Sequence, residues 1–191
     1  MQPPRLKPLA ESDMSEAQVK AMRELAGGLR GQFNTWGPNA ALLRSPELME
    51  RTQKVGEYLR YKSSIPTRLN EFAILITARH WSSQTEWVAH HPLALKAGLD
   101  PAVAADLAQG KRPAGMNEDE AAVYQFCTEI HENKGQMADA TWQAIADRFG
   151  ERGVMDLIAL TGYYTMLAMV LNVTRQPLPD GAPPPLAPLK R

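Results

Sequence analysis

The chain has 191 residues and a mass of 21.1 kDa, the size of one ordinary domain. Apolar residues make up 44% and charged residues 22%, a balance that allows a soluble chain to bury a core. Lys+Arg and Asp+Glu both number 21, so the formal net charge is zero. A neutral chain offers no electrostatic reason to expect nucleic acid or an anionic membrane as a partner, and low net charge favours association into an oligomer.

Cysteine usage narrows the chemistry, because the sequence has one cysteine, Cys127. A single thiol excludes an intramolecular disulfide, a Cys-x-x-Cys redox centre and a multi-cysteine zinc site. No other pattern has the spacing of metal ligands, so we expect neither a metal ion nor a cofactor. Cys127 falls on the apolar face of a predicted helix, and we expect it to be buried and inert. The lone thiol and the absence of a signal-peptide pattern favour a cytoplasmic location.

Helical periodicity and capping signals run along most of the chain, and no segment alternates as a strand would. Residues 1–14 are polar and proline-containing, which predicts an extended arm. Residues 176–191 are rich in proline and predict a tail that is disordered or lies across a neighbouring subunit. Residues 15–175 between them are expected to form one all-α domain of about seven helices. Eight segments have helical signals, although 67–80 and 83–98 could also form one long helix: 15–28, 46–61, 67–80, 83–98, 101–110, 117–134, 139–150 and 151–174.

Two loops in this scheme have identifiable signals. Glycines and a proline predict a structured loop over 29–39, whose Phe33 and Trp36 should pack on the core or line a pocket. No glycine or proline separates residues 67 and 91, but Ser83 and Glu86 have the spacing of a capping box. A new helix is therefore predicted to begin at Ser83, after a break near residue 81.

The segment 153–174 is apolar and long enough for a bilayer span of about 20 residues. Asp156 near its start, Gly162 in its middle and Asn172 near its end are unfavourable in a membrane. We expect this segment to be a buried helix in an oligomer core.

Candidate chemistry gathers around residues 83–90. Glu86 and His90 are four residues apart, so their side chains are expected to meet on one helix face, which Ser83 shares. A carboxylate beside an imidazole holds one tautomer and raises the imidazole pKa, as a general acid or base requires. The same spacing also fits a capping box followed by a surface histidine.

The run RLNEFAILITARHWSSQTEWVAHHPLALKAGLD resembles the carboxymuconolactone decarboxylase family, whose members share the all-helical fold of alkyl hydroperoxidase D. The likeness extends upstream through LLRSPELMERTQKVGEYLRYKSSIPTRLNE and downstream to LTGYYTMLAMVLNV. It covers roughly residues 30–175. The resemblance implies an alkyl hydroperoxidase D-like helical bundle and a homotrimer or homohexamer.

In the peroxidase branch of that family, a glutamate precedes a Cys-x-x-Cys-x-x-x-His motif. The resemblance places Glu71 at the glutamate, Ser83 and Glu86 at the two cysteines, and His90 at the histidine. Both cysteines are missing, so disulfide-based peroxidase activity is not expected. The remaining EW-x-x-H pattern resembles the decarboxylase-like branch.

The resemblance thus implies a cofactor-independent lyase that acts on a small carboxylated or lactone substrate, as in aromatic degradation. His90 would be the acid, Glu86 would orient it and Glu71 would complete a proton relay. Arg79 or His80 could bind a substrate carboxylate. Three tryptophans could wall the pocket, namely Trp36, Trp81 and Trp87.

Other reactions fit the same groups, because lactone hydrolysis, isomerisation and retro-aldol cleavage also begin with proton transfer beside a carbonyl. The alternative from a different class is a non-catalytic or small-molecule-binding helical oligomer derived from the hydroperoxidase-like fold. The two readings are distinguished by whether a pocket exists around His90 and whether it binds small carboxylic acids.

Overall fold

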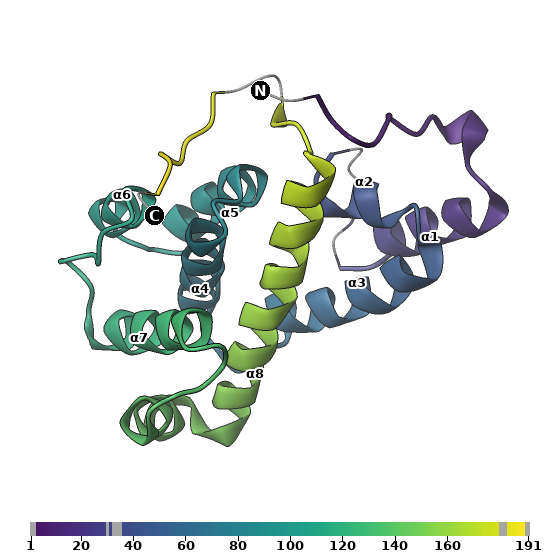
Figure 1. Ribbon diagram of the computed structural model, residues 1–191. Coiled ribbons are helices and arrows are strands. Elements are labelled where there is room, and N and C mark those ends of the chain that lie inside the picture. The colour runs from purple at the N-terminus through teal and green to yellow at the C-terminus, as the bar shows by residue number, and fades with distance from the viewer. Residues whose placement is uncertain (1–2, 30, 32–35, 180–182, 190–191) are drawn as a thin grey trace.

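The computed structural model describes residues 3–29, 31, 36–179 and 183–189 (Figure 1). Over these residues it contains helices and no strand, as predicted. A short 3-10 turn, η1 (Glu11–Asp13), precedes the helices. The eight α-helices are α1 (Glu16–Gly27), α2 (Pro38–Leu42), α3 (Pro46–Tyr61), α4 (Thr67–His80), α5 (Gln84–Lys96), α6 (Pro101–Ala108), α7 (Glu118–Glu132) and α8 (Asp139–Thr174).

The long helix α8 runs through the middle of the molecule, with α1–α3 on one side and α4–α7 on the other (Figure 1). The N-terminal arm lies against the end of α8, where the backbone N–H of Arg5 donates to the carbonyl of Thr174 at 2.9 Å. The described tail residues 183–189 pack on their own chain rather than extending away. Leu186 is buried there, and its backbone exchanges two hydrogen bonds with the Gln84 side chain at 2.9 Å each.

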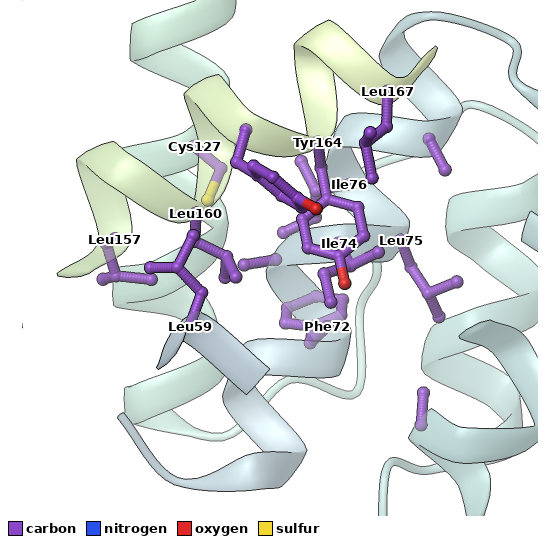
Figure 2. Packing of buried hydrophobic residues seen from close by; sticks show 14 of the residues in the cluster. Leu59, Phe72, Ile74, Leu75, Ile76, Cys127, Leu157, Leu160, Tyr164 and Leu167 are labelled. Atoms are coloured by element: carbon purple, nitrogen blue, oxygen red, sulfur yellow. The ribbon is translucent and has the colours of Figure 1, made fainter. Parts of the chain in front are cut away.

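Helix α4 is the centre of the core, since eleven of its fourteen residues are buried. It packs against α5, α7 and α8. A helix that is buried on all sides needs other helices around it, which fits this position. Figure 2 shows side chains of α4 interleaved with those of α8; the labelled ones are Phe72, Ile74, Leu75, Ile76, Leu157, Leu160, Tyr164 and Leu167.

The predicted helix starts at two capping boxes are confirmed. Ser15 and Gln18 form both reciprocal bonds at α1, and Asn117 and Glu120 do so at α7. The expected loop over 29–39 is wrong in part, because Pro38 begins the short helix α2. Phe33 lies outside the described residues.

Helix α8 joins the two helices predicted over 139–150 and 151–174. Gly150 lies between them with φ of 68° and ψ of 176°, a kink that only glycine adopts without strain. By length and composition, α8 is the one helix among the described residues that could cross a membrane, with a mean hydropathy of 1.6 over its most apolar window. Within the protein, 56% of that window is buried, which is typical of a core helix.

Candidate active site

The site is built on the break between α4 and α5. Helix α4 ends at His80 and α5 begins at Gln84, so the predicted break is confirmed. Ser82 has a φ of 50°, and this left-handed residue turns the chain back so that α5 packs against α4. In one straight helix, the 19 residues from Glu71 to His90 would span about 28 Å. The turn instead brings these two side chains together.

Glu71 and His90 form a buried hydrogen-bonded pair. Nδ1 of His90 lies 2.7 Å from Oε2 of Glu71, and the two residues are 8% and 5% exposed. With Glu71 as the carboxylate, the Nδ1–H of His90 donates to it, which sets the tautomer of the ring. The edge of the His90 ring meets Tyr164 of α8, with centroids 5.0 Å apart and planes at 88°. Two neighbouring helices therefore fix the orientation of this imidazole.

Glu86 does not orient His90, so that expectation is wrong. Neither carboxylate oxygen of Glu86 has a hydrogen-bond partner among the described residues, although the residue is only 3% exposed. Burial raises the pKa of this carboxyl well above its ordinary value, which favours the neutral acid. The physical reason for the difference is that Glu71 approaches from the neighbouring helix and occupies the Nδ1 side of His90.

Ser83 precedes α5 at its N-cap, but its hydroxyl makes no capping bond. The predicted capping box of Ser83 and Glu86 is therefore absent. Ser83 Oγ is fully buried and, within the described part of the chain, has no hydrogen-bond partner. Unsatisfied buried polar groups cost about 1–3 kcal/mol each and are uncommon away from functional sites. The Ser83 hydroxyl and the Glu86 carboxyl are two such groups, and they stand at the positions that the resemblance assigns to redox cysteines.

A cavity of about 640 Å³ opens beside Glu71. Its walls come from the end of α3, the start of α4 and the end of α5. Three cationic side chains line it, Arg60, Arg68 and Lys96. Arg68 is ion-paired with Glu120 of α7. The cavity therefore combines a proton-accepting carboxylate with an excess of positive charge, which suits an anionic ligand.

Sequence reasoning missed these three cations. Helix periodicity could have identified Arg68, because it lies one turn before Glu71 on the same helix. Arg60 and Lys96 belong to other helices, and no local pattern connects them with Glu71.

Arg79 and His80 do not reach this cavity. Eight residues separate Arg79 from Glu71 on α4, which corresponds to about 12 Å along the axis. Arg79 and His80 instead line a separate cavity of about 170 Å³ near His131 of α7. The structure thus divides the predicted substrate-binding residues from the Glu71–His90 pair.

The three tryptophans do not surround one pocket. Trp36 lines a cavity of about 310 Å³ that the N-terminal arm helps to form. Trp81 borders a cavity beneath the tail, and its Nε1–H donates to Thr165 Oγ1 at 3.2 Å. Trp87 is buried in the core with its ring stacked on His91 at 5.7 Å. Each has a packing role where it stands.

Cys127 is buried in the core, with its sulfur 3.7 Å from Thr161 Oγ1 (Figure 2). Burial raises the pKa of the thiol to about 12. A thiolate is the reactive form of cysteine, so this environment disfavours nucleophilic or peroxidatic chemistry at Cys127. No three His, Cys, Asp or Glu side chains of the described residues gather closely enough to hold a metal ion.

No protein-family model matches the sequence, and no curated protein is significantly similar to it. Solved structures do match. An uncharacterized peroxidase-related protein from Silicibacter sp. TM1040 superposes with a TM-score of 0.73 at 16% identity, over 92% of each chain. An uncharacterized peroxidase-related protein with an alkylhydroperoxidase AhpD core, from Ralstonia eutropha JMP134, also gives 0.73 at 14% identity, over 94% of this chain and 95% of that one.

The chain has the alkyl hydroperoxidase D-like fold. At these identities the likeness concerns the fold, which was the expectation from residues 30–175. Both neighbours are named as peroxidase-related. This chain has a single, buried thiol, so a disulfide cycle within the chain is excluded.

Proposed function

We propose that the protein is a cofactor-independent acid–base enzyme, a decarboxylase-like lyase acting on a small carboxylated or lactone substrate. The observation that carries this proposal is the buried Glu71–His90 pair, whose Glu71 is a lining residue of a cation-lined cavity. A buried pair of this kind holds a proton at a defined position and exchanges it with a bound molecule. The decarboxylase-like branch of the family, which the EW-x-x-H pattern resembles, supplies the reaction class.

Glu71 is among the lining residues of the cavity, and His90 is not. This arrangement assigns proton transfer with the substrate to Glu71, and His90 acts as the positioning residue that receives or returns the proton through Nδ1. This differs from the sequence-based hypothesis, in which His90 meets the substrate and Glu86 orients it.

For a β-keto acid, the bond between the α-carbon and the carboxylate breaks, CO2 leaves, and the electron pair remains as an enolate. A proton from the Glu71–His90 pair then adds to carbon, and a proton from solvent restores the pair. A cation bound to the departing carboxylate would favour the ground state. We therefore assign the cations of the cavity, with Lys96 and Arg60 foremost, to an oxyanion that persists: the enolate oxygen or a second carboxylate.

The test is CO2 release from a panel of β-keto acids and carboxylated lactones. Glu71→Gln keeps the side-chain shape and removes the proton-accepting carboxylate, so it should lower kcat by about 10²–10⁴-fold. Lys96→Met should raise KM, and so lower kcat/KM, and should leave the fold intact. The matched control is Glu118→Gln, whose side chain is 95% exposed on α7 and should leave activity unchanged.

Two results would count against the proposal. Undiminished CO2 release by Glu71→Gln would remove Glu71 from the chemistry. No release from any compound would reject decarboxylation of those substrates, and saturable binding of the same acids would then favour the non-catalytic, ligand-binding alternative.

A further inference from the structure

The C-terminal end of α4 carries a buried guanidinium that is only partly satisfied. Arg79 is 4% exposed, and its Nη2 donates to the carbonyl of Ala187 in the tail at 2.8 Å. Its Nε and Nη1 have no hydrogen-bond partner among the described residues. A buried charge is stable only when it is paired or fully hydrogen-bonded, so two idle donors on a buried cation need an explanation.

These donors belong to a side chain that lines the cavity of about 170 Å³ between α4, α7 and the tail. Lys111 adds a second positive charge to its wall, and Glu132 adds one negative charge. Glu132 is exposed to water, and no ion pair joins it to Arg79 among the described residues. The charged groups that face the cavity therefore leave a net positive charge.

Two histidines complete this wall without adding charge near neutral pH. His80 and His131 are stacked, with ring centroids 4.3 Å apart. Burial lowers the pKa of His80 and outweighs the opposing effect of the Glu132 carboxylate. Burial together with the neighbouring His80 lowers the pKa of His131 to about 4. Both rings are accordingly neutral hydrogen-bonding groups rather than competing cations.

We propose that this cavity is a binding site for a small oxyanion, a carboxylate or a phosphate, held by Arg79. The guanidinium presents two forks of paired N–H donors, one through Nε and Nη2 and one through Nη1 and Nη2. The bond to Ala187 uses one Nη2 hydrogen, so the fork on the other edge keeps both of its donors. That fork matches the two oxygens of a carboxylate or phosphate.

The size of the cavity limits the ligand. A volume of about 170 Å³ corresponds to about six water molecules, which admits inorganic phosphate or a short carboxylic acid. The tail forms part of the wall through Leu189, so the anion would lie between the end of α4 and the tail. This cavity shares no lining residue with the one beside Glu71, and the proposal stands whether or not the protein is a lyase.

Isothermal titration of sodium phosphate and of sodium acetate, in a low-salt buffer free of both anions, tests the site. Wild-type protein should bind one anion per chain that depends on Arg79, apart from any anion held in the Glu71 cavity, and the stronger of the two titrations identifies the ligand chemistry. Arg79→Met keeps the length and apolar stem of the side chain and should weaken binding at least tenfold. Lys96→Met alters the Glu71 cavity and is the matched control, which should leave this affinity unchanged.

Thermal unfolding separates ligand binding from a purely structural role of Arg79. The anion should raise the melting temperature of wild-type protein and not that of Arg79→Met. Lys111 is exposed, so Lys111→Gln should leave the fold intact, and it should weaken binding a few-fold. Absence of binding to wild-type protein, or binding lost in Lys96→Met and retained in Arg79→Met, would overturn the proposal.

Discussion

His90 and Glu71 are 19 residues apart in the chain, yet Nδ1 of one lies 2.7 Å from Oε2 of the other. The two residues come from different helices, and both are more than nine-tenths buried. Such a pair holds a proton in a site that water reaches poorly. Its strength can be measured independently of any substrate.

A double-mutant cycle with Glu71→Ala and His90→Ala should give a coupling free energy of about 1.5–3 kcal/mol, because a buried hydrogen bond to a charged group has that value. Urea denaturation of the four proteins measures it. The surface pair Lys54–Glu50, 3.3 Å apart on α3 with Lys54 exposed and Glu50 half-buried, is the control and should couple by less than about 0.5 kcal/mol. Additive effects of the two site variants would mean that the pair is not formed in solution.

Glu86→Gln should change how stability depends on pH. Burial raises the folded-state pKa of Glu86 above its ordinary value of 4.5, so between these values the folded protein binds more protons than the unfolded chain. Stability therefore falls as pH rises, by about 1.4 kcal/mol per unit within that window.

Glu86→Gln lacks this titration. It should be more stable than wild-type protein at pH 8, with a difference that shrinks toward pH 4. Melting temperatures across that range measure the effect, with exposed Glu118→Gln as the control. Parallel pH profiles for wild-type protein and Glu86→Gln would show that Glu86 is solvated.

Cys127 should resist thiol reagents in the native protein. Its pKa of about 12 leaves a thiolate fraction on the order of 10³-fold below that of a free cysteine, and burial blocks access as well. Iodoacetamide labelling at pH 8 should be slow under native conditions and complete in guanidinium chloride. Rapid stoichiometric labelling of native protein would reopen single-cysteine peroxide chemistry.

Asp156→Asn should loosen α8 from the α3–α4 connection. Asp156 Oδ1 accepts from Tyr58 Oη at 3.0 Å, and Oδ2 accepts from the backbone N–H of Ser64 at 2.7 Å. Burial would raise the pKa of Asp156, but these hydrogen bonds outweigh it and the pKa is lowered. In Asp156→Asn, the side-chain NH2 group would face the O–H of Tyr58 or the N–H of Ser64, both of which are donors. The lost hydrogen bond should lower the free energy of unfolding by about 1–3 kcal/mol.

The sign of the pH effect follows from the lowered pKa. The stabilisation by Asp156 is complete above its ordinary value of 3.8 and is lost as the pH falls through the folded value. Denaturation at pH 7 and pH 3 should show the Asp156→Asn deficit at pH 7 and a smaller one at pH 3. Exposed Asp147→Asn is the control; an equal deficit in that variant would contradict the role of the buried network.

The break after α4 shows how far local reasoning extends. Its position was predicted, but the reason was wrong, because Ser83 Oγ makes no capping bond. The turn is made by the left-handed Ser82 and by packing of α5 on α4. The capping boxes at Ser15 and Asn117 were predicted for the right reason, since each involves side chains only three residues apart.

The amino-acid sequence by itself determined the all-helical class, the apolar helix over 153–174 and the lack of a second thiol. Periodicity and composition can be read from the sequence without knowing the tertiary packing. Only the tertiary structure decided that Glu71 rather than Glu86 bonds to His90 and that Arg79 lies in a cavity of its own. Spacing along one helix says which side chains can meet, and packing between helices says which do. That packing depends on contacts between residues far apart in the chain, which no local pattern contains.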